Sequence, residues 1–558
     1  MGPAGVYPAP VRCARRPRWV APVPRAGRLA SSKRSDQNRR PGIPALDGLR
    51  AVAVVLVLAD HGGIPGMSGG FLGVDIFFVL SGFLITSLLL DELGRSGRID
   101  LAGFWIRRAR RLLPALMLMV LTVAVGRQLF PTEAIMGLRD DAIATFFWAA
   151  NWMFVAQKTD YFTQGAPPSP LQHAWSLGVE EQYYIGWPLL LIAVAVLLAA
   201  RARRRDRPAL LGGVRLAVFL LATLGMLASA AVAIILSSTR DRVYFGTDTR
   251  AQALLTGAAA SALLVGDWPA LNHGWSLIRT RWGKWIARLL PVIGLAALAM
   301  AAHYATGSGR EFRHGLLTAV AVAAVLVIAP VALDQRGPVA MVLSWHPLVW
   351  LGTISYGVYL WHWPIFLVLN GERTGWSGLS LFAVRCAATL AASAASWWLI
   401  ERPIRQWHPA RVPLLPLAGA TAATAAAVTM LVVPVGAKSG GAADTSLPPG
   451  ISSIAVVSPS PPIGSRPVRA VAQRDPHRPF TVSVFGDSIG WTLMHYLPST
   501  PGFDFVDHTV IGCSLVRGGP YRYFGQTLDQ KSECESWPGR WSAQVAEDRP
   551  DAVLLIVG

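Results

Sequence analysis

Residues Gly69 to Thr86 read GGFLGVDIFFVLSGFLIT, and this stretch decides the class of fold. It is almost wholly apolar and has nearly the length that a helix needs to cross a bilayer. Asp75 and Ser81 lie inside it. Because a carboxylate within a membrane span is costly, Asp75 is expected to have a partner, either Arg50 or another intramembrane cation. The alternative is an ion pair that only fixes the packing of two helices.

The rest of the chain repeats this apolar pattern. Of its 558 residues, 53% are hydrophobic and only 15% are charged, which indicates a multi-span membrane protein and not a soluble one. The pattern predicts ten helical spans plus one linking span. A short aromatic segment, Ile143 to Val155, is expected to be interfacial or re-entrant. Apolar runs of about spanning length start near Ala45, Phe71, Leu112, Tyr183, Val214, Ala251, Ile286, Gly315, Val349, Leu379 and Val412.

The charge distribution predicts the orientation of the spans. The formal net charge is +19, but the basic residues form short clusters in every second loop, which favours the positive-inside rule over nucleic-acid binding. The first 41 residues contain ten Lys or Arg and one acidic residue, so we expect a disordered, uncleaved cytosolic tail. The linking span, Val412 to Val435, is then expected to carry the chain outward across the inner (plasma) membrane. Everything after Gly436 is expected to be extracytoplasmic.

The chain is expected to divide into five parts. Residues 1–41 form the tail, 42–405 the membrane domain, 406–436 the linking span and 437–479 a Pro/Ser/Gly-rich linker. Residues 480–558 begin an extracytoplasmic α/β unit, with strands at Thr481–Phe485 and Ala552–Val557 and a helix at Ile489–Leu497. This last part is too short to complete a doubly wound sheet.

Arg50 and His61 lie eleven positions apart in one apolar stretch. Eleven residues make about three helical turns, so the two side chains share one face and are separated by roughly 16 Å along the axis. Such a pair is costly in a bilayer unless it has a function. A snorkelling Arg50 and an interfacial His61 are the alternative.

Two further groups of residues are candidates for chemistry. RRARRLLP begins with four arginines, Arg107, Arg108, Arg110 and Arg111, a cluster that suits phosphate binding but also serves to orient a span. Polar side chains inside other apolar runs are expected to line a site. They are Ser176 and Glu180 in HAWSLGVEEQYY (173–184), Arg250 in YFGTDTRAQALLTG (244–257), and Tyr359 and His362 in SYGVYLWHWP (355–364), where an aromatic belt is the alternative.

The four cysteines predict neither a disulfide scaffold nor a metal site. Cys513 and Cys534 lie 21 positions apart in the segment expected outside the cytosol, where a disulfide between them is plausible. Two unpaired thiols remain the alternative.

Together these segments resemble the acyltransferase-3 family of integral membrane acyltransferases, in the subgroup with a fused outer SGNH hydrolase-like domain. The resemblance covers about Leu46 to Arg405 and implies transfer of an acyl group, commonly acetyl, from cytosolic acyl-CoA to an envelope glycan or glycolipid, with no bound cofactor. It implies that His61 is the base or acyl-handling group, Arg50 its partner, and Arg107 with Arg110 the donor-side arginines. The matching motifs are Arg50-x10-His61, GVDIFFVLSGFLI, Arg107-x-x-Arg110, WSLGVEEQYY, TDTRA, SYGVYLWHWP and IERPIR.

The outer segment resembles the start of an SGNH domain. In VFGDSIG, Ser488 follows Asp487 on a strand-to-helix turn. Ser488 is expected to act as a nucleophile beside an oxyanion site. Gly512 matches the second oxyanion block of the family. The third block and the late Asp-x-x-His are absent, and His495 and His508 come too early to replace that base. Either the chain is truncated or the outer domain is inactive as it stands. We expect truncation, because a half-built sheet with an open apolar edge is a liability that proteins avoid. The sequence leaves the acceptor open, and peptidoglycan and lipopolysaccharide are among the candidates.

Two other functions are compatible with a multi-span protein of this composition. One is a transporter or flippase for an envelope lipid with an outer binding module, although the paired repeats typical of transporters are not visible. The other is a catalytically inactive glycan-binding membrane protein.

Overall fold

The structure is a computed structural model of the whole chain. It describes residues 43–135, 137–159, 161–162, 167–204, 211–264, 280–406, 478–498, 500–510, 521–523, 526–528 and 536–556. The predictions for the basic tail, the linking span from Val412, Gly512 and the Cys513–Cys534 disulfide lie outside these residues.

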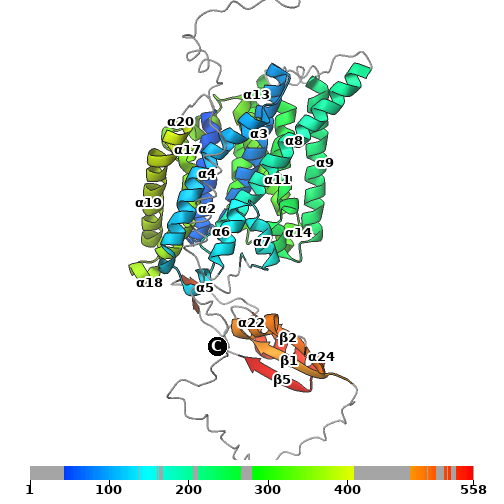
Figure 1. Cartoon of the computed structure of the whole chain (residues 1–558), viewed down its shortest axis with the longest axis vertical. Helices are drawn as coiled ribbons and strands as arrows, with labels where there is room; N and C mark the ends of the chain where they lie inside the picture. Colours follow the sequence, from blue (N-terminus) through cyan, green and yellow to red (C-terminus); the bar gives the residue numbers. More distant parts are fainter. Residues whose placement is uncertain are drawn as a thin grey trace, which may run out of the picture. The chain divides into compact units, whose positions relative to one another are not determined.

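The described residues between 44 and 406 form a bundle of long helices that pack side by side (Figure 1). Among the described residues, six helical segments are long and apolar enough to cross a membrane by length and composition, which confirms a helical domain compatible with a membrane. The long helices are α2 (Pro44–His61), α3 (Gly73–Ser96), α4 (Leu101–Val125), α8 (Trp175–Arg204), α9 (Leu211–Ile235), α11 (Thr247–Leu264), α13 (Arg281–Tyr304), α15 (Leu316–Leu333), α17 (His346–Val368) and α19 (Gly378–Ser396).

Short helical segments connect the long ones. The segment expected to be interfacial or re-entrant forms parts of two short helices, α6 and α7, separated by a turn in which Trp148 has φ 56°, so no helix of spanning length forms there. The short segments are η1 (Gly70–Leu72), η2 (Arg127–Leu129), α5 (Thr132–Ile135), α6 (Leu138–Phe146), α7 (Ala150–Ala156), η3 (Gln172–Ala174), α10 (Arg240–Phe245), α14 (Gly309–Arg313), α16 (Pro338–Leu343), α18 (Gly371–Thr374), the π-helical turn η4 (Trp397–Glu401) and α20 (Arg402–Gln406).

Glycines let two pairs of helices approach closely. A Cβ at Gly257 of α11 would lie 2.1 Å from the carbonyl oxygen of Val79 in α3. A Cβ at Gly352 of α17 would lie 1.8 Å from the carbonyl oxygen of Asp47 in α2. Inside a bilayer the hydrophobic effect does not draw helices together. Small residues at the contact let the two backbones approach closely and pack. These contacts bring the polar side chains of the paired helices within bonding distance.

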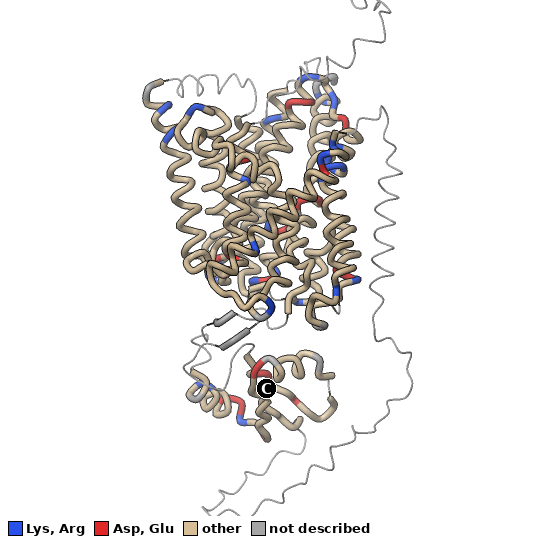
Figure 2. Tube along the Cα trace, turned by 90° about the vertical axis from the view of Figure 1, so that its left-hand side faces the viewer, with Lys and Arg blue, Asp and Glu red and all other residues tan. Residues whose placement is uncertain are grey.

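The charged residues are distributed unevenly along the helical bundle. Most described Lys, Arg, Asp and Glu residues lie toward the two ends of the helical bundle, and a few lie within it (Figure 2). Because charges inside an apolar bundle need partners, the internal ones mark the region in which to look for a site.

The described C-terminal residues form a small α/β unit. Its three-stranded parallel sheet has the order β2-β1-β5, with β1 at Phe480–Gly486, β2 at Phe503–Thr509 and β5 at Ala552–Ile556. This confirms both predicted strands to within one residue. The remaining elements are α22 (Ser488–Tyr496), α24 (Trp537–Asp548) and the antiparallel pair β3 (Tyr521–Tyr523) and β4 (Gln526–Leu528).

One carboxylate joins three elements of this unit. Ser483 Oγ of β1 donates a hydrogen bond to Asp548 Oδ2 of α24 at 2.7 Å, and His508 Nε2 of β2 lies 2.5 Å from the same oxygen. These hydrogen bonds hold the pKa of Asp548 below its ordinary value. His508 therefore contacts α24 through Asp548.

Candidate active site

A cavity of about 70 Å³ lies between α2, α3, α4, α8 and α17. Its walls combine apolar, hydroxyl and charged side chains, which is typical of a ligand site. The lining residues are Arg50, Val74, Phe77, Phe78, Ser81, Arg108, Arg111, Leu112, Ser176, Leu177, Glu180, Tyr184, Ser355, Tyr356 and Tyr359.

Three arginines line this cavity. Arg50 comes from α2, where its Nη1 lies 3.1 Å from Asp47 Oδ1. Arg108 comes from α4 and places its guanidinium 3.6 Å from the centre of the Tyr184 ring. Arg111 lies one turn further along α4, on the same face. The concentration of positive charge suits an anionic ligand.

The arginine pair expected on the donor side is not the pair that the cavity contains. Arg107 and Arg110 are absent from its walls, and Arg107 is exposed. Arg108 and Arg111 line the cavity instead. Each directly follows one of the expected arginines, and a shift of one position turns a side chain by about 100° around the helix axis. The sequence identified the cluster but not the face that it presents.

A polar cluster continues along the wall of the cavity. Ser81 Oγ and Tyr184 Oη both donate hydrogen bonds to Glu180 Oε1. Further along, Ser176 Oγ lies 2.7 Å from Tyr359 Oη, which donates to a backbone carbonyl. Four polar residues singled out from the sequence, on three different helices, therefore share one cavity: Ser81, Ser176, Glu180 and Tyr359.

His61 lies beyond Tyr359 in a second polar group. Its Nδ1 is 2.9 Å from His362 Nε2, and its Nε2 is 2.9 Å from Tyr161 Oη. His362 is fully buried on α17, one turn after Tyr359, whose carbonyl oxygen lies 2.5 Å from His362 Nδ1. Sequence reasoning missed the contact with Tyr161, which lies outside every motif that was considered.

The structure places the two residues of α2 in different surroundings. Arg50 pairs with Asp47 near the start of the helix, while His61 at its end contacts His362 and Tyr161, so the partner role that the resemblance implies for Arg50 is not a direct contact. The aromatic belt, which was the alternative for the segment around Tyr359, does not fit, since Tyr359 and His362 are buried within the bundle. Arg50 lines the cavity and His61 belongs to the histidine pair, and both side chains come from α2.

The partner of Asp75 is Arg250 and not Arg50. Arg250 Nη1 lies 3.1 Å from Asp75 Oδ1, and the two side chains are 0% and 1% exposed. The Arg250 guanidinium also lies 4.5 Å from the centre of the Tyr244 ring and 5.3 Å from that of Trp175. Arg250 is thus enclosed in the bundle.

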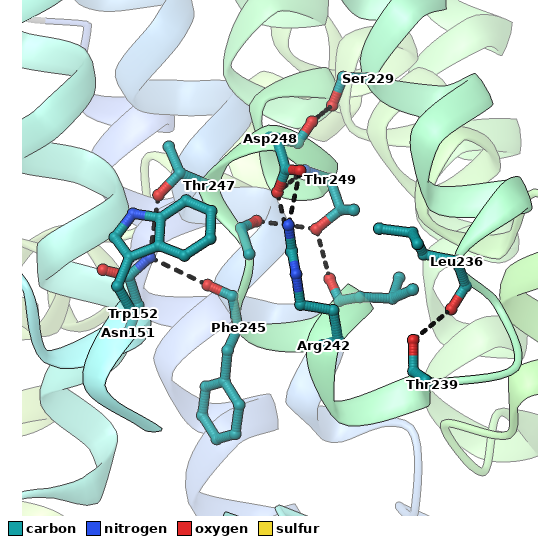
Figure 3. A network of polar contacts seen from close by, with 12 residues as sticks. Asn151, Trp152, Ser229, Leu236, Thr239, Arg242, Phe245, Thr247, Asp248 and Thr249 are labelled. Carbon is teal, nitrogen blue, oxygen red and sulfur yellow. Dashed lines mark hydrogen bonds and ion pairs between the residues drawn. The ribbon is translucent and has the colours of Figure 1, made fainter. Parts of the chain in front are cut away.

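A polar network fixes the start of the helix that carries Arg250 (Figure 3). Arg242 of α10 donates two hydrogen bonds to the carboxylate of Asp248, at 2.9 and 2.7 Å. Asn151 of α7 donates to the Phe245 carbonyl at 3.1 Å and to Thr247 Oγ1 at 2.9 Å. The three helices are therefore joined just ahead of the buried ion pair.

Comparison with known proteins defines the class. Residues 43–401 match the acyltransferase domain of the acyltransferase-3 family, so the chain belongs to this family. The resemblance derived from its motifs is thereby confirmed.

Individual relatives cover the same region. The chain is 36% identical to YrhL of Bacillus subtilis over 371 residues, which are 65% of this chain and 55% of that protein. It is 35% identical to the peptidoglycan O-acetyltransferase OatA of Listeria monocytogenes (67% of this chain, 57% of the relative) and 35% identical to the O-acetyltransferase OatA of Staphylococcus aureus (70% and 62%). The chain thus covers only 55 to 62% of the length of these relatives. No solved structure matches it.

Proposed function

We propose that the chain is a membrane O-acyltransferase that moves a small acyl group, acetyl in the first instance, from cytosolic acyl-CoA to a hydroxyl of an envelope glycan. The observation that carries this proposal is the neighbourhood of two groups: Tyr359 lines the arginine-containing cavity and lies one turn before His362, which contacts His61. Peptidoglycan is the proposed acceptor because one of the similar proteins is named for it.

The cavity suits an acyl-CoA donor. Coenzyme A carries phosphates, for which Arg50, Arg108 and Arg111 supply guanidinium donors. Its uncharged arm can follow the apolar wall at Phe77 and Leu112. A thioester already holds an activated acyl group, so the site needs to position it and remove one proton.

His61 is the proposed base. Its Nε2 faces a hydroxyl group in this structure and can accept a proton from an acceptor hydroxyl in the same way. The hydroxyl oxygen then attacks the thioester carbonyl, the C–S bond breaks, and the leaving thiolate takes the proton from the His61 imidazolium. Atoms and charges balance without a further reactant.

The hydroxyl that His61 activates is proposed to belong to an intermediate acceptor, from which Ser488 of the outer segment takes the acyl group by ester exchange and passes it to a glycan hydroxyl. Ser488 is the first residue of α22 and is separated from the end of β1 by one residue. The side chain of the intervening Asp487 accepts a hydrogen bond from Ile489 N at 2.9 Å. The start of a helix offers free backbone N–H groups for an oxyanion. Ser488→Ala is expected to spare release of acyl groups from the donor but to block their appearance on the glycan; equal loss of both would contradict this division of labour.

The proposed topology follows the charge pattern. We propose ten spans plus one in the inner (plasma) membrane, with the basic N-terminal tail in the cytosol and the SGNH-like segment outside. The six apolar helices among the described residues support a multi-pass protein.

The test is alkali-labile acyl release from purified envelope glycans of cells that express the unmutated protein, His61→Ala, or neither. His346→Ala is the matched control, because His346 is an exposed histidine at the start of α17. We expect acyl release only with the unmutated and His346→Ala proteins, at matched levels in the membrane. Unchanged acyl release from cells with His61→Ala would refute the proposal.

A further inference from the structure

We propose that His362 is a positioning residue that sets the tautomer of His61 and carries part of the positive charge when His61 accepts a proton. This inference rests on the proposed function, in which His61 is the base. His362 contacts His61 but lies 301 positions after it in the chain, on a different helix.

The first step concerns the proton on His362. Its Nδ1 lies 2.5 Å from the Tyr359 carbonyl oxygen, which can only accept a hydrogen bond. Nδ1 must therefore carry a hydrogen. In a neutral imidazole the other nitrogen, Nε2, then has a free lone pair.

The second step concerns the contact between the two rings. His61 Nδ1 is 2.9 Å from His362 Nε2, and the ring planes differ by only 7°. The ring centres are 5.1 Å apart, which is close to the nitrogen–nitrogen distance plus one ring radius at each end. The rings thus meet edge to edge in nearly one plane, the geometry of an N–H···N hydrogen bond.

The third step follows from the first two. Because His362 Nε2 accepts, His61 Nδ1 must donate, and the free lone pair of His61 is left on Nε2, which faces Tyr161 Oη. The Tyr359 carbonyl therefore determines, through two rings, which nitrogen of His61 is basic. When Nε2 gains a proton, the imidazolium keeps its hydrogen bond to His362, which stabilises a charge that the buried site would otherwise disfavour.

Two amide substitutions separate this role from simple packing. The oxygen of Gln in His362→Gln reaches about as far as Nε2 and can accept from His61 Nδ1–H. Asn in His362→Asn reaches only as far as Nδ1, so it can still donate to the Tyr359 carbonyl but leaves His61 without its acceptor. The two amides are similar in chemistry and differ in which end of the imidazole they replace.

The experiment measures transfer of labelled acetyl from acetyl-CoA to envelope glycan in membrane vesicles that contain the full chain. We expect His362→Asn to lower kcat by on the order of 10²- to 10³-fold and His362→Gln by no more than about 10-fold, with the KM for acetyl-CoA within about twofold of the unmutated value. Thermal unfolding in detergent checks that both variants are folded.

The outcomes separate this inference from the proposed function. Equal kcat values for the Asn and Gln variants, whether high or low, would overturn the positioning role of His362. A His61→Ala protein that still transfers acetyl would overturn the proposed base itself. Loss of transfer in His61→Ala together with the expected Gln-over-Asn order supports both.

Discussion

The buried ion pair between Asp75 and Arg250 gives the sharpest prediction about stability. Asp75→Asn keeps the size of the side chain and an oxygen that can accept from Arg250, but it removes the negative charge. Arg250 cannot give up its proton, so the variant holds an uncompensated cation with 0% exposure. Removing one partner of a buried pair costs about 3–5 kcal/mol of unfolding free energy.

The surroundings of Arg250 place the expected cost at the lower end of this range. Its guanidinium keeps its contacts with the Tyr244 and Trp175 rings, 4.5 and 5.3 Å away, and such contacts contribute up to about 2 kcal/mol when they are desolvated. The expected loss is therefore about 3 kcal/mol. Arg250→Met in the Asp75→Asn background removes the isolated charge and should regain more than half of this loss.

The assay is SDS-induced unfolding in mixed micelles, followed by tryptophan fluorescence. Asp91→Asn is the matched control, because Asp91 lies on the same helix and pairs with Arg95, whose side chain is 59% exposed. A surface pair of this kind contributes less than about 1 kcal/mol. Equal losses for Asp75→Asn and Asp91→Asn, or a double variant no more stable than Asp75→Asn alone, would refute the electrostatic argument.

Three further predictions concern the donor site, a helix contact and the outer segment. Arg111→Gln should raise the KM for acetyl-CoA at least about 10-fold, whereas Arg107→Gln, outside the cavity, should change it less than about twofold in the same vesicle assay. Gly257→Ala should lower the unfolding free energy by about 1–3 kcal/mol, while Gly186→Ala, where no atom lies within 4 Å of the added Cβ, should not lower it in the SDS titration. The depressed pKa of Asp548 stabilises the fold above the ordinary carboxyl value of 3.8, so the protection of β1 amides against hydrogen exchange, relative to the unfolded chain at the same pH, should fall as the pH drops below that value; an Asp548→Asn protein that shows the same loss of protection would contradict this origin.

Much of the architecture was predictable because the apolar runs are long. Each of the first ten runs contains or overlaps one of the long helices, and the strand at Thr481–Phe485 was placed to within one residue at each end. A bilayer demands about 20 apolar residues per helix, and this requirement is visible in any sequence that meets it. Its short length, together with the charge pattern of the loops, excluded the segment from Ile143 as a span, and two short helices are found there.

The pairing of residues was less predictable. Composition indicated that Asp75 needs a cation, but Arg50 and Arg250 satisfy this requirement equally well until the packing of α3 against α11 is known. Likewise, four arginines in five positions identify a basic cluster, while only the rotation of α4 determines that Arg108 and Arg111 face the cavity. Tyr161 lies between two elements and has no periodic signal at all.

The contact between α2 and α17 has a consequence for how the protein is made. His61 emerges early from the ribosome, but its partner His362 is synthesised 301 residues later. At ordinary elongation rates this interval is roughly 15 to 60 s. Throughout it, the first helix waits in the membrane with its histidine lacking that partner. A nascent chain thus lacks the assembled histidine pair until almost the whole helical domain has been inserted.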